Sequence, residues 1–219
     1  MTRKLIGALL AGACLIATAA IAAEPEPEGA AFVRTDDGWT GWLPHDDEYA
    51  EYTVGGDAQP LDATHVQLKP GQGVMLTFAD KKDFAKDKNL LEAHRAWELD
   101  YWRQQSGKVE SRNRDDLAGG RSGLMVTEIH VPGPDGAAIT ICMVAAAGNN
   151  GVFVFAISPV TPQDDSMIKK FAASIKVVHH PLDLVAEAKK YMPGKQGPKA
   201  GQKPADQKTA DRKAPDKKP

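Results

Sequence analysis

Cysteine is scarce in this chain of 219 residues, which contains only Cys14 and Cys142. Cys14 lies in an apolar N-terminal segment, so cleavage of that segment leaves one cysteine and no intramolecular disulfide. The sequence also lacks the C-x-x-C, H-E-x-x-H and EF-hand spacings that mark common zinc and calcium sites. These absences exclude a disulfide-stabilised scaffold, and the sequence predicts no metal and no cofactor.

Long apolar runs are absent as well. The longest, residues 5–16, has about a dozen residues, whereas a membrane-spanning helix needs about 20. A basic pair precedes it and small residues follow, which is typical of a cleaved secretory signal peptide over residues 1–23. We therefore expect a periplasmic or secreted protein without a transmembrane segment. A lipoprotein anchored through Cys14 is the weaker alternative, because Ala11 stands where a lipobox usually carries a larger aliphatic residue.

Aromatic and large aliphatic residues are missing from residues 193–219, which carry eight Lys or Arg against three Asp. Such a segment buries too little apolar surface to fold, so the sequence predicts a disordered basic tail. Since the whole chain carries −2 and both ends are basic, the single globular domain expected over residues 24–192 carries −9. This acidity argues against a nucleic-acid partner, and the tail predicts only weak contact with anionic envelope surfaces.

Hydrophobic patterns predict the elements of the domain. Residues 64–80 form two alternating runs around a Pro-Gly turn, which indicates a hairpin. Residues 89–106 predict a helix that starts with Asn89 and Glu92 as a capping box and stops at Gly107. Its expected buried stripe comprises Leu90, His94, Trp97 and Tyr101.

Three further strands are expected over residues 122–131, 137–147 and 152–158. The last is apolar at odd and even positions alike, which predicts a central strand covered on both faces. Thr161 then begins a helix over 163–174 with the buried stripe Met167, Ile168, Phe171 and Ile175, followed by a short strand at 175–178. A last helix is expected from Pro181 to Ala188, with His180 as its cap. Together these predict an α+β fold, an antiparallel sheet with helices on both faces in an α/β/α sandwich.

This order of elements, with a hairpin around "PDG", the strand "VFVFAIS" and the closing "KFAASIKVV", resembles the PsbP-like fold family over about residues 32–178. That family includes the photosystem II accessory protein and bacterial envelope or accessory proteins of the DcrB and effector-chaperone type. The resemblance implies a non-catalytic role in docking on or stabilising another protein, and it transfers no site residue. DcrB-like proteins are lipid-anchored, whereas the signal here resembles that of soluble exported proteins, which argues against a membrane-tethered role.

A thiol hydrolase needs a nucleophile and a base in contact, and Cys142, His130 and Glu128 lie on neighbouring expected strands. If Val131 pairs with Ala137, Cys142 faces Val126 and lies four residues, about 13 Å, from His130 along the strands. The sequence therefore favours Cys142 as a buried core thiol and predicts no catalytic residue.

Two other groups of residues are candidate sites. The loop from His45 to Glu48 is acidic, but adjacent side chains diverge, so a solvated loop is favoured over a cation site. The adjacent histidines at 179–180 do not have the spacing of a known metal-ligand motif either. Trp39 and Trp42 are candidates for an exposed binding surface, and this is left open. For Trp97 core packing is favoured.

The glycine-rich stretch from Gly119 to Gly123 leads into a strand and lacks the P-loop lysine, so it is interpreted as a turn. The leading hypothesis is thus an exported periplasmic, non-catalytic binding or accessory protein with a chaperone-like role, whose partner is another envelope protein. The alternatives are an immunity or inhibitor protein that binds an envelope-acting effector, and a small hydrolase with an unrecognised site. The sequence leaves the oligomeric state open.

Overall fold

The structure, a computed structural model, describes residues 31–84, 89–133 and 136–191. The predicted signal peptide and basic tail lie outside the described residues. The strands are β1 (Ala31–Thr35), β2 (Gly38–His45), β3 (Glu48–Gly55), β4 (Gln59–Pro60), β5 (His65–Lys69), β6 (Gln72–Asp80), β7 (Glu110–Asn113), β8 (Leu124–Pro132), β9 (Ala138–Ala147), β10 (Gly151–Ser158) and β11 (Lys176–Val178). The helices are α1 (Lys81–Phe84), α2 (Leu90–Ser106), α3 (Asp115–Ala118), α4 (Asp165–Ser174) and α5 (Leu184–Tyr191), with a 3₁₀ turn, η1 (Pro162–Asp164), before α4.

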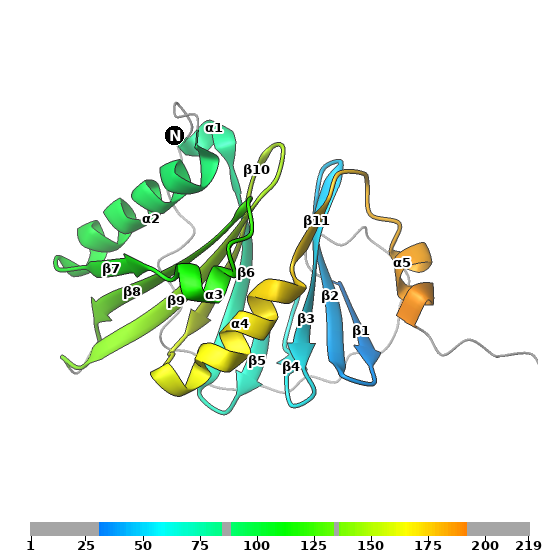
Figure 1. Cartoon of the computed structure of the whole chain (residues 1–219), viewed down its shortest axis with the longest axis horizontal. Helices are drawn as coiled ribbons and strands as arrows, with labels where there is room; N and C mark the ends of the chain where they lie inside the picture. Colours follow the sequence, from blue (N-terminus) through cyan, green and yellow to red (C-terminus); the bar gives the residue numbers. More distant parts are fainter. Residues whose placement is uncertain (1–30, 85–88, 134–135, 192–219) are drawn as a thin grey trace, which may run out of the picture.

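The larger of two antiparallel sheets has seven strands in the order β4-β5-β6-β10-β9-β8-β7 (Figure 1). The predicted hairpins are confirmed as β5–β6 and β8–β9. The apolar run of β10 occupies the middle position, hydrogen-bonded to β6 on one side and to β9 on the other. The prediction of an α+β fold with an antiparallel sheet and a central strand at 152–158 is therefore confirmed.

The two faces of β10 pack against different elements. Val152 and Val154 belong to a core beneath α2. Phe153 and Phe155 belong to a second core, which contains residues of α3, of α4 and of the smaller sheet. The expected single sheet flanked by helices is thus too simple: α2 covers one face, whereas α4 shares the other face with a second sheet (Figure 1).

That second sheet has the order β1-β2-β3-β11 and was not predicted, apart from its last strand at 175–178. Its inner face carries Tyr52, whose ring contacts Phe155 of β10 and Phe171 of α4 at centroid distances of 5.0 and 6.0 Å. Tyr52 pairs across the sheet with Gly41. A Cβ at Gly41 would stand 2.6 Å from the Tyr52 ring, so only glycine leaves room for it.

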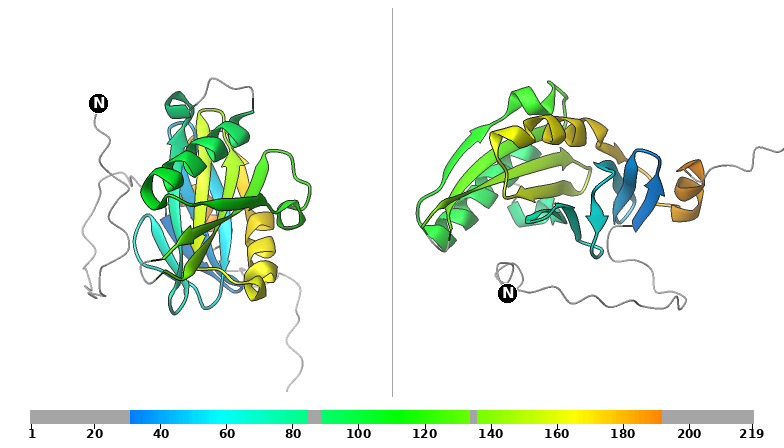
Figure 2. Two further views of the ribbon diagram at one scale, coloured as in Figure 1. Left: turned by 90° about the vertical axis from the view of Figure 1, so that its left-hand side faces the viewer. Right: turned by 90° about the horizontal axis from the view of Figure 1, so that it is seen from below.

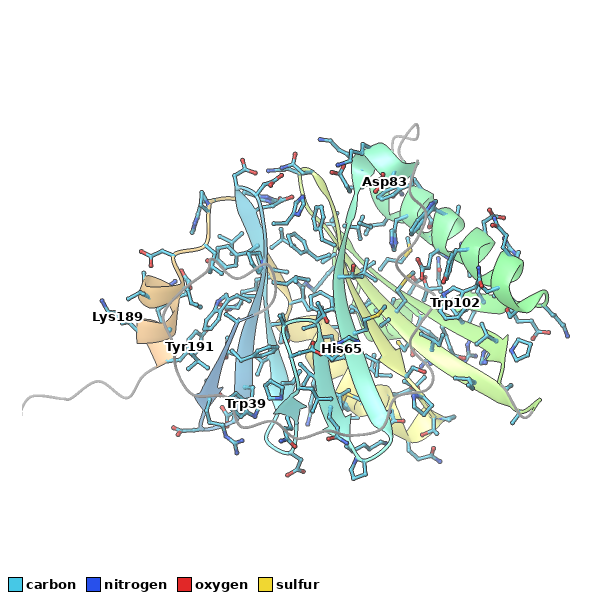
Figure 3. All side chains as sticks on the ribbon, turned by 180° about the vertical axis from the view of Figure 1, so that it is seen from behind. Trp39, His65, Asp83, Trp102, Lys189 and Tyr191 are labelled. Carbon is cyan, nitrogen blue, oxygen red and sulfur yellow. The ribbon has the colours of Figure 1, made fainter. Side chains whose placement is uncertain are left out.

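Helix α5 packs on the outer face of the smaller sheet. Tyr191 donates a hydrogen bond of 3.0 Å to Glu51 of β3, and its ring lies 5.9 Å from that of Trp42. In Figure 3, Tyr191 and Trp39 lie at the end of the molecule that holds this sheet, and Trp102 of α2 lies toward the opposite end. The right-hand view in Figure 2 likewise places α5 at the far side of the smaller sheet from α2.

The predicted N-cap of helix α2 at Asn89 and its stop at Gly107 are confirmed, but only the Asn89 half of the predicted capping box is found among the described residues. The Asn89 side chain accepts a hydrogen bond from the Glu92 N–H at 3.2 Å, and Gly107 follows the last turn with φ 77°. The buried stripe is shifted from the expected one, because Leu91, His94 and Leu99 are buried. The prediction that Trp97 packs in the core is wrong, since 36% of that residue is exposed.

Helix α4 also starts as predicted, with Thr161 and Asp164 forming a capping box across η1. Ile168, Phe171 and Ile175 of the expected stripe are buried. For α5, the predicted start at Pro181 and the cap at His180 are wrong. The helix begins at Leu184, and Asp183 accepts a 3.0 Å hydrogen bond from the Ala186 N–H.

Candidate binding site

A cavity of about 430 Å³ opens where α4 and α3 meet the outer strands of the seven-stranded sheet. Its floor is apolar and its walls are charged or polar. The strands β7, β8 and β9, together with the segments around α3 and α4, supply the lining residues Glu110, Ser111, Arg112, Arg114, Leu117, Glu128, His130, Thr140, Cys142, Val160, Thr161, Pro162, Asp165 and Ile168. Two arginines and three carboxylates therefore surround a space large enough for a few side chains of a partner.

Strand register places the polar residues of this cavity. Glu128 pairs with Arg112 on one side and with Cys142 on the other. His130 pairs with Glu110 and with Thr140. Because alternate residues of a strand share a face, all six lie on the cavity side of the sheet, whereas Ile129 between them faces α2.

Glu128 is the electrostatic centre of the cavity, and its side chain is only 10% exposed. Arg112 donates to both carboxylate oxygens at 3.0 Å, and Arg114 donates to Oε2 at 2.8 Å. Burial acts to raise the pKa of Glu128, but the hydrogen bonds from the two arginines outweigh it and lower the pKa. Glu128 is therefore an anion at neutral pH, fixed by its two partners.

Arg114 joins this carboxylate to the helices. Its side chain is 12% exposed and bonds Asp116 of α3 and Asp165 of α4 in addition to Glu128. A buried guanidinium with all of its nitrogens bonded to carboxylates is strongly held in place. The network fixes the position of α3 and of the first turn of α4 relative to β8.

His130 uses both ring nitrogens within the cavity wall. Nε2 lies 2.8 Å from Glu128 Oε1, and Nδ1 lies 3.0 Å from Thr140 Oγ1. Because ionised Glu128 can only accept, Nε2 must carry the proton. Nδ1 pairs with the Thr140 hydroxyl, so both ring nitrogens of His130 are already engaged.

Cys142 contributes its thiol to the floor of the cavity, and the residue is 2% exposed. Burial raises its pKa to about 12, so the thiol is protonated at neutral pH. The prediction of a buried core thiol is confirmed.

The register on which the distance from Cys142 to His130 was estimated is wrong. Cys142 faces Glu128, not Val126, because Pro132 pairs with Ala138 and the loop closes through a Gly133 N–H to Ala137 O bond. Cys142 and His130 are therefore diagonal neighbours on adjacent strands, about 7–8 Å apart between Cα atoms rather than about 13 Å.

The acidic loop from His45 to Glu48 is the turn between β2 and β3. Glu48 is fully buried and accepts hydrogen bonds from the N–H groups of Asn149 and Asn150 at 2.8 and 3.0 Å, and His179 lies 3.1 Å away. Its carboxylate thus attaches the smaller sheet to the β9–β10 turn, and the expectation that the loop is wholly solvated is wrong for Glu48. Within residues 31–84, 89–133 and 136–191 no three His, Cys, Asp or Glu side chains are arranged to hold a metal ion.

Trp39 and Trp42, the candidates for an exposed binding surface, lie in different environments. Trp42 is completely buried and donates to Glu51 at 3.2 Å, so it cannot belong to an exposed surface. Trp39 is partly buried against the core, and the Arg34 guanidinium lies 5.1 Å from its ring centre. Trp39 and Trp42 are three residues apart in β2, so their side chains point to opposite faces of the sheet and do not form one platform.

The glycine-rich segment 119–123 is a turn, as predicted, but Arg121 within it has an unexpected role. Its guanidinium donates to the carbonyls of Ala172 and Ile175 at 2.9 and 2.6 Å, at the C-terminal end of α4. A cation there satisfies carbonyls that the helix leaves unpaired. Arg121 and Arg114 thus hold opposite ends of α4.

Sequence reasoning missed Arg112, Arg114 and Asp165, which complete the cavity. One signal was available, because charged and polar residues alternate in "ESRNR" from Glu110 to Arg114 before the expected strand. A short strand rich in charged side chains is typical of a sheet edge. Apart from Asp116, which is two residues from Arg114, the partners of the two arginines are 14 to 51 residues away, and no local pattern reveals them.

Neither the scan against protein-family models nor the search of curated proteins gave a match. Within the described part of the chain, no helix has the length and apolar character required to cross a bilayer.

Proposed function

We propose that this chain is an exported periplasmic, non-catalytic binding protein with an accessory or chaperone-like role, which uses the cavity to hold another envelope protein. The observation that carries the proposal is the cavity itself, whose charged walls are fixed by Glu128 and Arg114. A wall that is already ordered loses little conformational freedom when a partner binds, which favours affinity.

The same hydrogen bonds argue for binding over catalysis. A thiol with a pKa of about 12 is a poor nucleophile, and His130 is engaged by Glu128 and Thr140. The thiol is thus protonated at neutral pH, and both ring nitrogens of His130 already have partners.

The resemblance to PsbP-like proteins agrees with this function. It is supported by the antiparallel sheet with α2 and α4 on opposite faces, although the four-stranded sheet was not part of the expected pattern. The family's accessory roles are the reason for proposing a protein partner in the envelope.

A small hydrolase is the second candidate, and one observation favours it: Cys142, Glu128 and His130 line the same cavity. Replacing Cys142 by Ala separates the two functions. A hydrolase would lose its activity, whereas a binding protein would keep its partner.

The binding function is tested by capture of partners from an envelope extract, with quantitative mass spectrometry. Thr140→Trp places a large ring in the cavity, and Thr35→Trp makes the same change on β1 of the smaller sheet as a matched control. We expect one stoichiometric partner for the natural chain and the control, and at least a tenfold loss for Thr140→Trp with unchanged far-UV circular dichroism. Equal capture by all three chains would refute the use of this cavity. A toxic effector as the captured partner would identify the protein as an immunity protein.

A further inference from the structure

The edge strand β7 forms the open rim of the cavity. It ends the seven-stranded sheet and pairs with β8 alone. Among the described residues no further backbone hydrogen bond reaches Glu110–Asn113. Its outer row of N–H and C=O groups therefore offers a place for another strand.

Two rows of side chains cross the cavity wall and end on this strand. The first row runs from Cys142 through Glu128 to Arg112. Two nitrogens of Arg112 bind Glu128, while Nη1 bonds no described residue and the side chain is 62% exposed. The first row thus ends on a cation with a free donor.

The second row runs from Thr140 through His130 to Glu110. One oxygen of Glu110 lies 2.9 Å from Lys108 Nζ, and the side chain is 66% exposed. Its other oxygen bonds no described residue. The second row thus ends on an anion with a free acceptor, two residues from the cation of the first row.

We infer that the partner adds to β7 as an antiparallel strand and extends both rows, an inference that rests on the proposed function. A carboxylate of the partner lies opposite Arg112, and a Lys or Arg lies opposite Glu110. Because the added strand runs against β7, its sequence reads acidic-x-basic from N- to C-terminus. Every pair in this sheet is antiparallel, and opposite charges directly across strands stabilise the pairing.

The test starts from random nine-residue peptides displayed on phage and selected on the full chain. We expect enrichment of peptides with the acidic-x-basic pattern. The best peptide, made synthetically with a fluorophore, is then titrated against the natural chain and the variants Glu110→Lys and Asp37→Lys, with binding followed by fluorescence anisotropy. Both variants change one exposed carboxylate to a cation, but Asp37 lies in the β1–β2 turn of the smaller sheet.

Glu110→Lys should raise the dissociation constant at least tenfold, because it sets like charges opposite each other, and Asp37→Lys should change it less than twofold. Two peptides with the same side chains, N-methylated on one or the other alternate set of residues, report on the edge hydrogen bonds. One of them should lose binding at least tenfold.

The inference would be overturned if the selected peptides lacked the acidic-x-basic pattern. It would also be overturned if neither Glu110→Lys nor either set of N-methyl groups changed the dissociation constant. In that case the charges of β7 only protect the edge from pairing. If Thr140→Trp still abolishes partner capture, the proposed function stands without strand addition. If Thr140→Trp captures the partner as well as the natural chain does, both the proposed function and the strand addition are wrong.

Discussion

At the scale of single residues, the Cys142 thiol shows how burial sets chemistry. With a pKa of about 12, roughly one thiol in ten thousand is ionised at pH 8. We predict that the chain from Glu24 onward, in which Cys142 is the single cysteine, reacts with a disulfide reagent at least a hundredfold more slowly when native than in urea. Stopped-flow absorbance measures both rates. Equal rates would mean that the thiol is accessible and would restore the hydrolase reading.

His94 predicts a pH dependence of stability. It belongs to the buried face of α2, and burial lowers its pKa to about 4 from an ordinary value near 6.5. In the unfolded chain His94 therefore binds a proton below about pH 6.5, whereas in the folded chain it does so only below about pH 4. The free energy of unfolding thus decreases as the pH falls through this window. We expect about 2 kcal/mol to be lost between pH 7 and pH 5 through this residue.

Urea unfolding of the natural chain and of His94→Met at both pH values checks this. The variant should show the smaller loss on acidification, because Met takes up no proton. An identical loss in the two chains would show that His94 is not the titrating group.

At the scale of elements, Phe155 tests whether β10 is the shared centre of the fold. Its buried ring contacts Tyr52 of the smaller sheet and Phe171 of α4, at centroid distances of 5.0 and 5.4 Å. Phe155→Ala should lower the free energy of unfolding by about 3–5 kcal/mol, measured in urea. Val185→Ala, at a residue 63% exposed on α5, should change it by less than about 0.5 kcal/mol. A cost for Phe155→Ala below about 1 kcal/mol would contradict the packing described for β10.

Elements also show where sequence reasoning works and where it stops. The strands at 137–147 and 152–158 were predictable because apolar residues are continuous there, and α2 because Asn89 and Gly107 mark its ends. The meander of β1 to β3 was missed because β3 carries Glu48 and Glu51, which are buried and whose charge-bearing or donor partners include Asn149 and Lys176, more than 100 residues away. A charged residue within a strand pattern predicts a solvent-exposed position, unless the distant partner that pairs with the charge is known.

The site was predictable only in part, for the same reason. The neighbouring strands with Glu128, His130 and Cys142 were expected, but their register depends on where the hairpin closes. Each residue gained or lost in the loop changes which side chains face one another. The bonds of Arg112 and Arg114 follow from that register and from the placement of α4, neither of which local sequence determines.

At the scale of the whole molecule, charge separates the chain into an acidic domain and a basic C-terminal segment. Removing residues 193–219 should leave the melting temperature unchanged, because the segment lacks the apolar residues needed for packing. It should weaken binding to an anionic envelope surface, where each cation contributes up to about 1 kcal/mol. Co-sedimentation with envelope fragments at low and high salt checks this, and high salt should remove the difference by screening. If both chains pellet equally at low salt, the segment is a spacer.

Site-specific photo-cross-linking in cells shows directly whether a partner protein binds at the cavity rim. A photoreactive phenylalanine analogue is introduced at Glu110 on the rim, and separately at Asp37 in the β1–β2 turn, and adducts are identified by mass spectrometry. We predict one dominant protein adduct from position 110 and none from position 37. The claim is contradicted if position 110 gives no adduct, or if both positions give the same adducts in equal yield.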